Sequence, residues 1–266
     1  MTEAAPIGLR LREWRQRRRL SQLDLALEAD ISTKHVSFLE TGRAAPSRDM
    51  LLHLCERLEV PLRDRNALLV SAGYAPVFPE RDLSDQALAP IREAIDKVLA
   101  GHEPYPALAI DRHWQLVAAN RMVMPLMAGA DPSLLTAPIN VLRLSLHPQG
   151  LASRIVNYGE WRAHLLARLK RQIDLSADDT LSALYSELST YPAPSGNTMR
   201  RMPAERDAAQ LAVPFEFATE AGILRFFSTT MMFGTPVDIT LAELAIESFF
   251  PADTATAELL RRLAPE

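Results

Sequence analysis

Several features are scarce in this chain of 266 residues. It holds a single cysteine, Cys55, which excludes an internal disulfide framework and fits a reducing cytoplasm. No stretch reaches the roughly 18 apolar residues that a membrane-spanning helix needs. Residues 1–6 lack the charged start and long apolar core of a signal peptide. We therefore expect a cytoplasmic protein with no membrane partner.

Signatures of catalysis and of metal binding are also missing. The six histidines show no metal-ligand spacing, and one cysteine cannot complete a zinc site. There is no phosphate-binding loop, no GxGxxG or GxSxG motif and no paired-carboxylate signature. Isolated histidines are weak evidence for a haem ligand. We expect no enzyme, no catalytic residues, no metal site and no cofactor other than a possible bound apolar molecule.

Two helix starts lie eleven residues apart near the N-terminus. Ser21 and Ser32 each occupy an N-cap position directly before an apolar-periodic run. The second run ends at Gly42, a good helix stop. Two short helices joined by a tight turn form a helix-turn-helix, whose second helix can enter a DNA major groove. The residues expected to face the core are Leu23, Ala26, Leu27, Val36 and Leu39.

The first 75 residues as a whole indicate a compact all-helical module. Helices are expected over residues 8–19, 21–29, 32–41, 47–58 and 61–73. The whole chain has a net charge of -4, yet residues 1–75 hold 12 Lys and Arg against 10 Asp and Glu. The six arginines from Arg10 to Arg19 suggest a phosphate-facing patch, the alternative being a solvated helix face.

This module resembles the xenobiotic-response-element (XRE) family of helix-turn-helix regulators, which includes phage Cro and repressor domains. The matching strings are Leu11–Arg15, Leu20–Gln22, Leu25–Ala26, Ile31–Ser32, Leu39–Arg43 and Pro46–Ser47. The resemblance implies a buried structural ion pair between Arg15 and Glu40, and it places Gln22 on a DNA phosphate. The DNA-binding residues expected from the resemblance and from the face opposite the core are Gln22, Ser32, Thr33, Lys34, His35, Ser37, Phe38 and Arg43.

Two positions of the module leave a question open. Phe38 has no polar group, so it would contact a thymine methyl or a sugar, or else pack against the first two helices. Asp30 stands in the turn where the resembled family usually has glycine. Because Asp tolerates left-handed backbone geometry better than most residues, we expect the turn to form.

The rest of the chain suggests a linker and a second domain. We expect a helix-turn-helix DNA-binding domain over 1–75, a linker with a connecting helix over 76–104, and a ligand-binding domain over 105–266. The connecting helix would pair with its copy in a dimer or pack under the second domain. In that domain strands flank a turn at Asp111–His113, and Asn120 is expected to cap a helix. The later elements are helices at 157–173 and 181–188, a loop at 191–197, strands at 213–218, 223–232 and 244–250, and a helix at 254–263.

This second half resembles the MmyB-like regulators, whose C-terminal ligand-binding domain is PAS-like. The strings that carry the resemblance are His102–Pro106, Asp111–Trp114, Ala118–Asn120 and the long run Phe227–Pro251. It implies a one-component regulator with a small apolar molecule, a fatty acid in some members, in its cavity. Arg225 would meet a ligand carboxylate or be a solvated strand residue. Candidate ligand-binding residues, each of which would otherwise be plain core, are Trp114, Met122, Phe215, Phe217, Phe226 and Met231.

These observations predict an α+β protein, an all-α five-helix DNA-binding domain followed by a PAS-like α/β sensor domain with an antiparallel sheet. Its expected function is sequence-specific DNA-binding transcriptional regulation under control of a small apolar ligand. The expected partners are double-stranded DNA, that ligand and a second copy of the chain, because one short helix reads too few base pairs for useful specificity. The alternative is a C-terminal half that serves as a ligand-free dimerisation or protein-interaction module.

Overall fold

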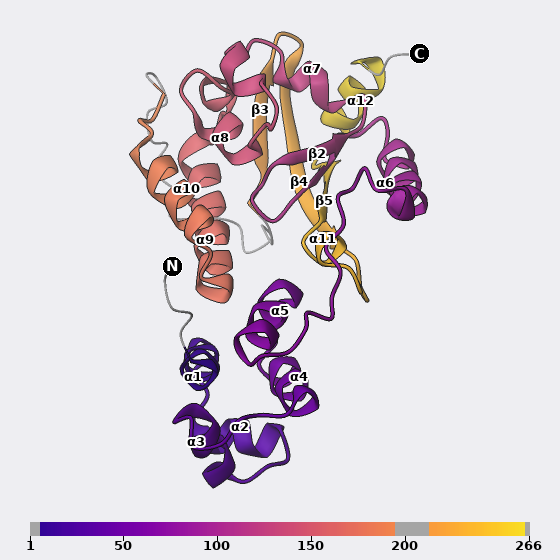
Figure 1. Ribbon diagram of the computed structural model, residues 1–266. Coiled ribbons are helices and arrows are strands. Elements are labelled where there is room, and N and C mark those ends of the chain that lie inside the picture. Colours follow the sequence, from indigo (N-terminus) through magenta and orange to yellow (C-terminus); the bar gives the residue numbers. More distant parts are fainter. Residues whose placement is uncertain (1–5, 195–212, 264–266) are drawn as a thin grey trace. The chain divides into compact units, whose positions relative to one another are not determined.

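The computed structural model describes residues 6–194 and 213–263, and Figure 1 shows its elements. The described residues divide into two compact units. The first contains residues 6–81, 174–176 and 235–242, and the second contains 82–173, 177–194, 213–234 and 243–263. The expected α+β class is confirmed, since a helical module precedes an antiparallel sheet with helices. The loop expected at 191–197 lies partly outside the described residues.

Five helices build the module of the first unit, as expected from the sequence. Their bounds are α1 Ile7–Arg17, α2 Gln22–Glu28, α3 Thr33–Glu40, α4 Arg48–Arg57 and α5 Leu62–Ser71. The hydroxyls of Ser21, Ser32 and Ser47 cap α2, α3 and α4 by accepting a backbone N–H three residues further on. Asp30 has φ +52°, which confirms the left-handed turn between α2 and α3.

The buried face of α2 differs from the expected one. Of the three core residues expected there, Ala26 is buried as predicted, whereas Leu23 and Leu27 are 55% and 73% exposed and Leu25 is buried instead. The physical reason is the shortness of the helix. Leu23 and Leu27 lie four residues apart, and so do Leu25 and Ala29, so a helix of seven residues offers two apolar faces. Packing with α1 and α3 decides between them, and the local pattern does not.

A five-stranded antiparallel sheet is the centre of the second unit (Figure 1). The strands are β1 Ala107–Ile110, β2 Leu116–Ala119, β3 Phe215–Thr219, β4 Gly222–Met232 and β5 Ala245–Pro251, in the order β2-β1-β5-β4-β3. The period of two expected in β4 is present, with Leu224 and Phe226 buried and Ile223 and Phe227 exposed. Strand β4 therefore turns one regular face toward the core.

Helices flank both faces of this sheet. The remaining elements are η1 Gln86–Leu88, α6 Ala89–Gly101, α7 Val123–Met127, η2 Pro132–Leu135, α8 Val141–Leu146, η3 Ala152–Arg154, α9 Tyr158–Ser176, α10 Asp179–Thr190, α11 Ile239–Ala242 and α12 Thr254–Leu263. On one face α6 buries Ile95 and Leu99 against β1 and against Ile246 of β5. Of the two arrangements considered for the connecting helix, the structure shows the packing on the sheet. No helix of the described ranges is long and apolar enough to cross a membrane.

Asn120 does not cap a helix, contrary to the expectation. Its side-chain nitrogen donates to the carbonyl oxygens of Leu99 at 3.1 Å and Tyr105 at 2.7 Å, and its Oδ1 accepts from the Ala107 N–H at 3.2 Å. These backbone groups lie at the end of α6 and the start of β1. Buried backbone groups need hydrogen-bond partners, and the Asn120 side chain supplies them here. Helix α7 begins only at Val123 and has no side-chain cap.

The chain between β4 and β5 contributes a segment to the first unit. Asp238 is 1% exposed and accepts a hydrogen bond from Arg81 Nη1 at 2.9 Å. The Ile239 N–H donates to the Pro79 carbonyl at 2.9 Å, and Thr240 Oγ1 donates to the Arg81 carbonyl at 2.6 Å. Residues 235–242, which we call the junction segment, thereby bind the residues that follow α5, and α11 contacts α5 itself.

Candidate nucleic-acid interface and candidate ligand cavity

A buried ion pair joins α1 to α3 in the helical module. Arg15 Nε and Nη2 donate to the two carboxylate oxygens of Glu40 at 2.6 and 2.9 Å, and both residues are buried. Gln22 Nε2 donates to the same carboxylate at 2.8 Å. Burial alone would raise the pKa of Glu40, but the hydrogen bonds from Arg15 and Gln22 outweigh it and hold that pKa below its ordinary value. The ion pair implied by the family resemblance is present.

The outward side of α3 gathers two cations around an aromatic ring. Val36 and Leu39 point into the core, which leaves Phe38 half-buried and outside the hydrophobic cluster of the module. Lys34 Nζ lies 5.5 Å and Arg43 Cζ lies 5.8 Å from the centroid of its ring. The ring faces of aromatic residues attract cations at such distances. Phe38 therefore helps to position both cations at the surface.

The other residues expected at DNA lie along the same segment. Ser32 is exposed, and its hydroxyl accepts the His35 N–H at 3.1 Å. Thr33, His35 and Ser37 are half-buried. Gln22 is half-buried at the first turn of α2, and its amide nitrogen donates a hydrogen bond to the Glu40 carboxylate. The eight residues thus form one stretch of surface around α3, and their contact with DNA stays a prediction.

The arginine run of α1 supplies fewer free cations than its composition suggests. Arg15 is buried with Glu40, Arg10 Nη1 donates to the Ala67 carbonyl at 3.2 Å, and Arg18 Nε donates to the Leu58 carbonyl at 2.8 Å. Half of the run therefore holds the module together. The other arginines of the run are exposed, namely Arg12, Arg17 and Arg19.

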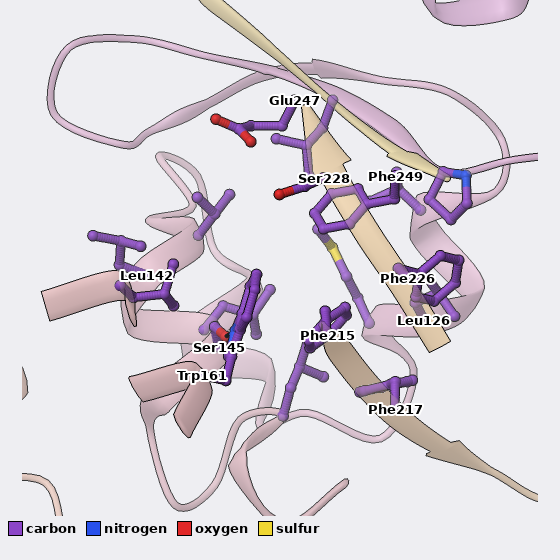
Figure 2. A pocket seen from close by; sticks show the side chains of 18 of the residues that line it. Leu126, Leu142, Ser145, Trp161, Phe215, Phe217, Phe226, Ser228, Glu247 and Phe249 are labelled. Carbon is purple, nitrogen blue, oxygen red and sulfur yellow. Dashed lines mark hydrogen bonds between the residues drawn. The ribbon is translucent and has the colours of Figure 1, made fainter. Parts of the chain in front are cut away.

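A cavity lies in the second unit between the sheet and helices α7, α8 and α9 (Figure 2). The space within it that is open to the centre of a water-sized molecule is about 110 Å³, inside a hollow of about 840 Å³ that includes solvent at its opening. Its wall is mostly apolar, and the ring of Phe215 forms part of that wall, 4.8 Å from Trp161 and 6.1 Å from Phe226 between centroids. Mostly apolar cavities with a few polar groups are typical of small-molecule sites.

The expected ligand-binding residues divide into two groups. Trp114, Phe215, Phe217 and Phe226 line the cavity. Met122 and Met231 do not. Met122 is buried in the core beside the cavity, whereas Met231 is 46% exposed, because odd-numbered residues of β4 face away from the side occupied by Phe226. These two placements correct the expected set, and ligand contact by the other four stays a prediction.

One end of the cavity is polar. Arg168 of α9 forms an ion pair with Glu247 of β5, and Arg168 Nη2 also donates to Thr230 Oγ1 at 3.0 Å. Thr230 Oγ1 in turn donates to Glu247 at 2.9 Å. The guanidinium of Arg168 lies 4.6 Å from the ring centroid of Trp114. Figure 2 shows Glu247 and Ser228 together at this end.

Family models match both parts of the chain. Residues 91–263 match the MmyB-like transcription regulator ligand binding domain, and residues 6–68 match a helix-turn-helix domain. The chain belongs to the MmyB-like transcription regulators. Among curated proteins, the uncharacterized HTH-type transcriptional regulator RghRB of Bacillus subtilis (strain 168) is similar, with 32% identity over 102 residues. The match covers 38% of this chain and 65% of that relative.

The polar residues in the cavity of this MmyB-like domain were not predicted from the sequence. Glu247 and Thr230 are paired across β5 and β4, and Arg168 reaches them from α9. Only the strand register and the helix packing bring these three together, so no local pattern marks them. The one signal is Glu247 itself, a carboxylate inside an apolar strand. Arg225, which was considered for a ligand carboxylate, instead pairs with Asp253 at 3.4 Å on the outer face.

Proposed function

We propose that this MmyB-like regulator binds double-stranded DNA through α3 and senses a small apolar molecule in the cavity of its ligand-binding domain. The observation that carries the proposal is the cavity beneath the sheet, with its aromatic wall and its charged pair at one end. A packed core fills its interior to a density that leaves few voids larger than a water molecule. An apolar ligand would bury its surface against Phe215, Phe226 and their neighbours. The family resemblance suggests a fatty acid, and an uncharged amphiphile with a similar chain is the alternative.

The chemistry of each side chain on and beside α3 would determine whether it contacts a DNA phosphate or a base edge. Lys34 and Arg43 would neutralise phosphates, and Thr33 and Ser37 would donate to base edges. Phe38, held between the two cations, would contact a thymine methyl or a sugar. One helix of eight residues reads few base pairs, so we propose that two copies bind a near-palindromic site.

The junction segment offers a route between the cavity and the helical module. Strand β4 lines the cavity with Phe226 and Ser228, and residues 235–242 follow directly after it in the chain. That segment holds Arg81 through Asp238. A ligand that favours one arrangement of β4 would therefore bias the residues that follow α5, provided that it binds the two arrangements with different affinities.

Native mass spectrometry of the purified protein, followed by organic extraction, tests the sensing function. We expect a bound apolar molecule, or tight binding of an added one such as decanol. A protein that carries none and binds none would favour the alternative, a C-terminal half that only dimerises or contacts other proteins. Analytical ultracentrifugation with and without DNA tests the dimer.

A further inference from the structure

The polar end of the cavity holds one positive and one negative charge. Among the described residues that line it, Arg168 is the one cation and Glu247 the one anion. Glu247 is 5% exposed, so its carboxylate depends on Arg168 and Thr230 in place of water. Figure 2 shows this end well separated from Phe217 and Leu126. A ligand with a polar head would therefore meet a charge-balanced site.

Arg168 is fixed in its present position by three contacts. It pairs with Glu247, donates to Thr230 Oγ1 at 3.0 Å and lies on the face of Trp114. Trp114 is itself held, because its Nε1 donates to Gln172 at 2.9 Å. Turning the guanidinium toward a ligand would break this set and leave the buried Glu247 carboxylate without its counter-charge.

We propose that the cavity selects apolar ligands with an uncharged polar head, and that Glu247 is the residue that excludes a carboxylate. The inference rests on the proposed sensing function. An ionised ligand head would place a second anion beside Glu247, with one guanidinium to balance both. Burying an unpaired charge is strongly unfavourable, and like charges in a site shielded from water repel each other.

An uncharged head finds, at the same end, a hydroxyl without a partner in the described part of the chain (Figure 2). Ser228 lines the cavity, and its hydroxyl has no partner among the residues that the structure describes. The other lining hydroxyl, Ser145, lies away from this end beside Trp161, whose Nε1–H it accepts at 3.2 Å (Figure 2). An alcohol, ester or amide would bond to the Ser228 hydroxyl without disturbing the Arg168–Glu247 pair. The proposed ligand class is therefore a neutral amphiphile.

The test compares two ligands that share one alkyl chain and differ in the charge of the head. Binding of decanol and of decanoate to the full-length protein is measured near neutral pH by displacement of a fluorescent apolar probe. We expect the wild type to bind decanol roughly tenfold or more tightly than decanoate, because an unpaired buried charge costs at least that much. In Glu247→Gln, Arg168 loses its anionic partner, so the preference should shift toward decanoate by about tenfold or more.

Glu216→Gln is the matched control, because Glu216 is also a strand glutamate beside an arginine, Arg225, but does not line the cavity. It should keep the wild-type preference. If the wild type prefers decanoate, or if Glu247→Gln keeps the wild-type preference, the inference is wrong and the sensing function stands. If neither ligand binds, the sensing function fails and the inference fails with it. Should Glu247→Gln not fold, the wild type with decanoate and its uncharged methyl ester decides in the same way.

Discussion

Arg15 and Glu40 form a bidentate ion pair, buried between α1 and α3, that also anchors Gln22 of α2. Removing one partner leaves the other charge buried and unpaired. We expect Arg15→Ala to lower the free energy of unfolding by about 3–5 kcal/mol, measured by urea denaturation. Arg12→Ala, an exposed arginine of the same helix, should change it by no more than about 0.5 kcal/mol. Equal effects of the two variants would show that the pair has no structural role.

The same carboxylate predicts how stability depends on pH. The pKa of Glu40 is lowered in the folded protein, so the unfolded chain binds its proton at a higher pH than the folded chain does. The pair therefore stabilises the fold above the unfolded pKa of about 4.3, and this stability is lost as pH falls further through the folded pKa. Unfolding free energies measured between neutral pH and acid should fall less steeply for Glu40→Gln. An unchanged slope would contradict the role of Glu40.

Lys34 and Arg43 should contribute to DNA affinity without contributing to sequence preference. Each is exposed beside Phe38, so we assign each to a phosphate. Changing either to Ala should weaken binding to a duplex selected from random sequences and reduce the salt dependence of log K by about 0.9 for each phosphate that is no longer neutralised. Fluorescence anisotropy at several salt concentrations measures both quantities. Lys97→Ala, an exposed lysine on α6, is the control and should match the wild type.

The sequence predicted those elements whose signal is local. Serine caps fixed the starts of three helices of the module, and the alternation in β4 correctly separated Phe226 from Phe227. The apolar pattern gave a wrong prediction where one helix has two possible buried faces. In α2 the pairs Leu23–Leu27 and Leu25–Ala29 have the same spacing, and tertiary packing selected the second.

The candidate sites show the same division. Val36 and Leu39 determine which side of α3 faces outward, so the residues proposed to face the DNA groove follow from helix geometry. The polar end of the cavity does not, because Arg168 and Glu247 are 79 positions apart and meet only through packing. Asn120 is a residue type that often caps helices. Here its side chain instead forms hydrogen bonds with backbone carbonyls of Leu99 in α6 and of Tyr105 before β1. Contacts between residues far apart in the chain cannot be predicted from the local sequence pattern.

A substitution that weakens the contacts of the junction segment should reduce the effect of the ligand on DNA affinity. It should not change the binding of the ligand or of DNA when each is measured alone. Arg81 holds the buried Asp238, whose carboxylate also accepts the Thr240 N–H at 2.9 Å. We expect Arg81→Gln to bind decanol and DNA like the wild type but to lose most of the effect of decanol on DNA affinity. Arg121→Gln, which removes the ion pair with Glu103, is the control and should keep that effect. If Arg81→Gln also responds normally, the junction segment is not the route.

The central claim is that a molecule in the cavity controls how the helical module binds DNA. Its most direct test is the affinity for a selected duplex at fixed salt, with and without saturating decanol, for the wild type and for Ser228→Phe, which fills the polar end. We expect decanol to change the affinity of the wild type by about fivefold or more and to leave Ser228→Phe unaffected. A wild type that binds decanol and shows the same DNA affinity with and without it would contradict the account.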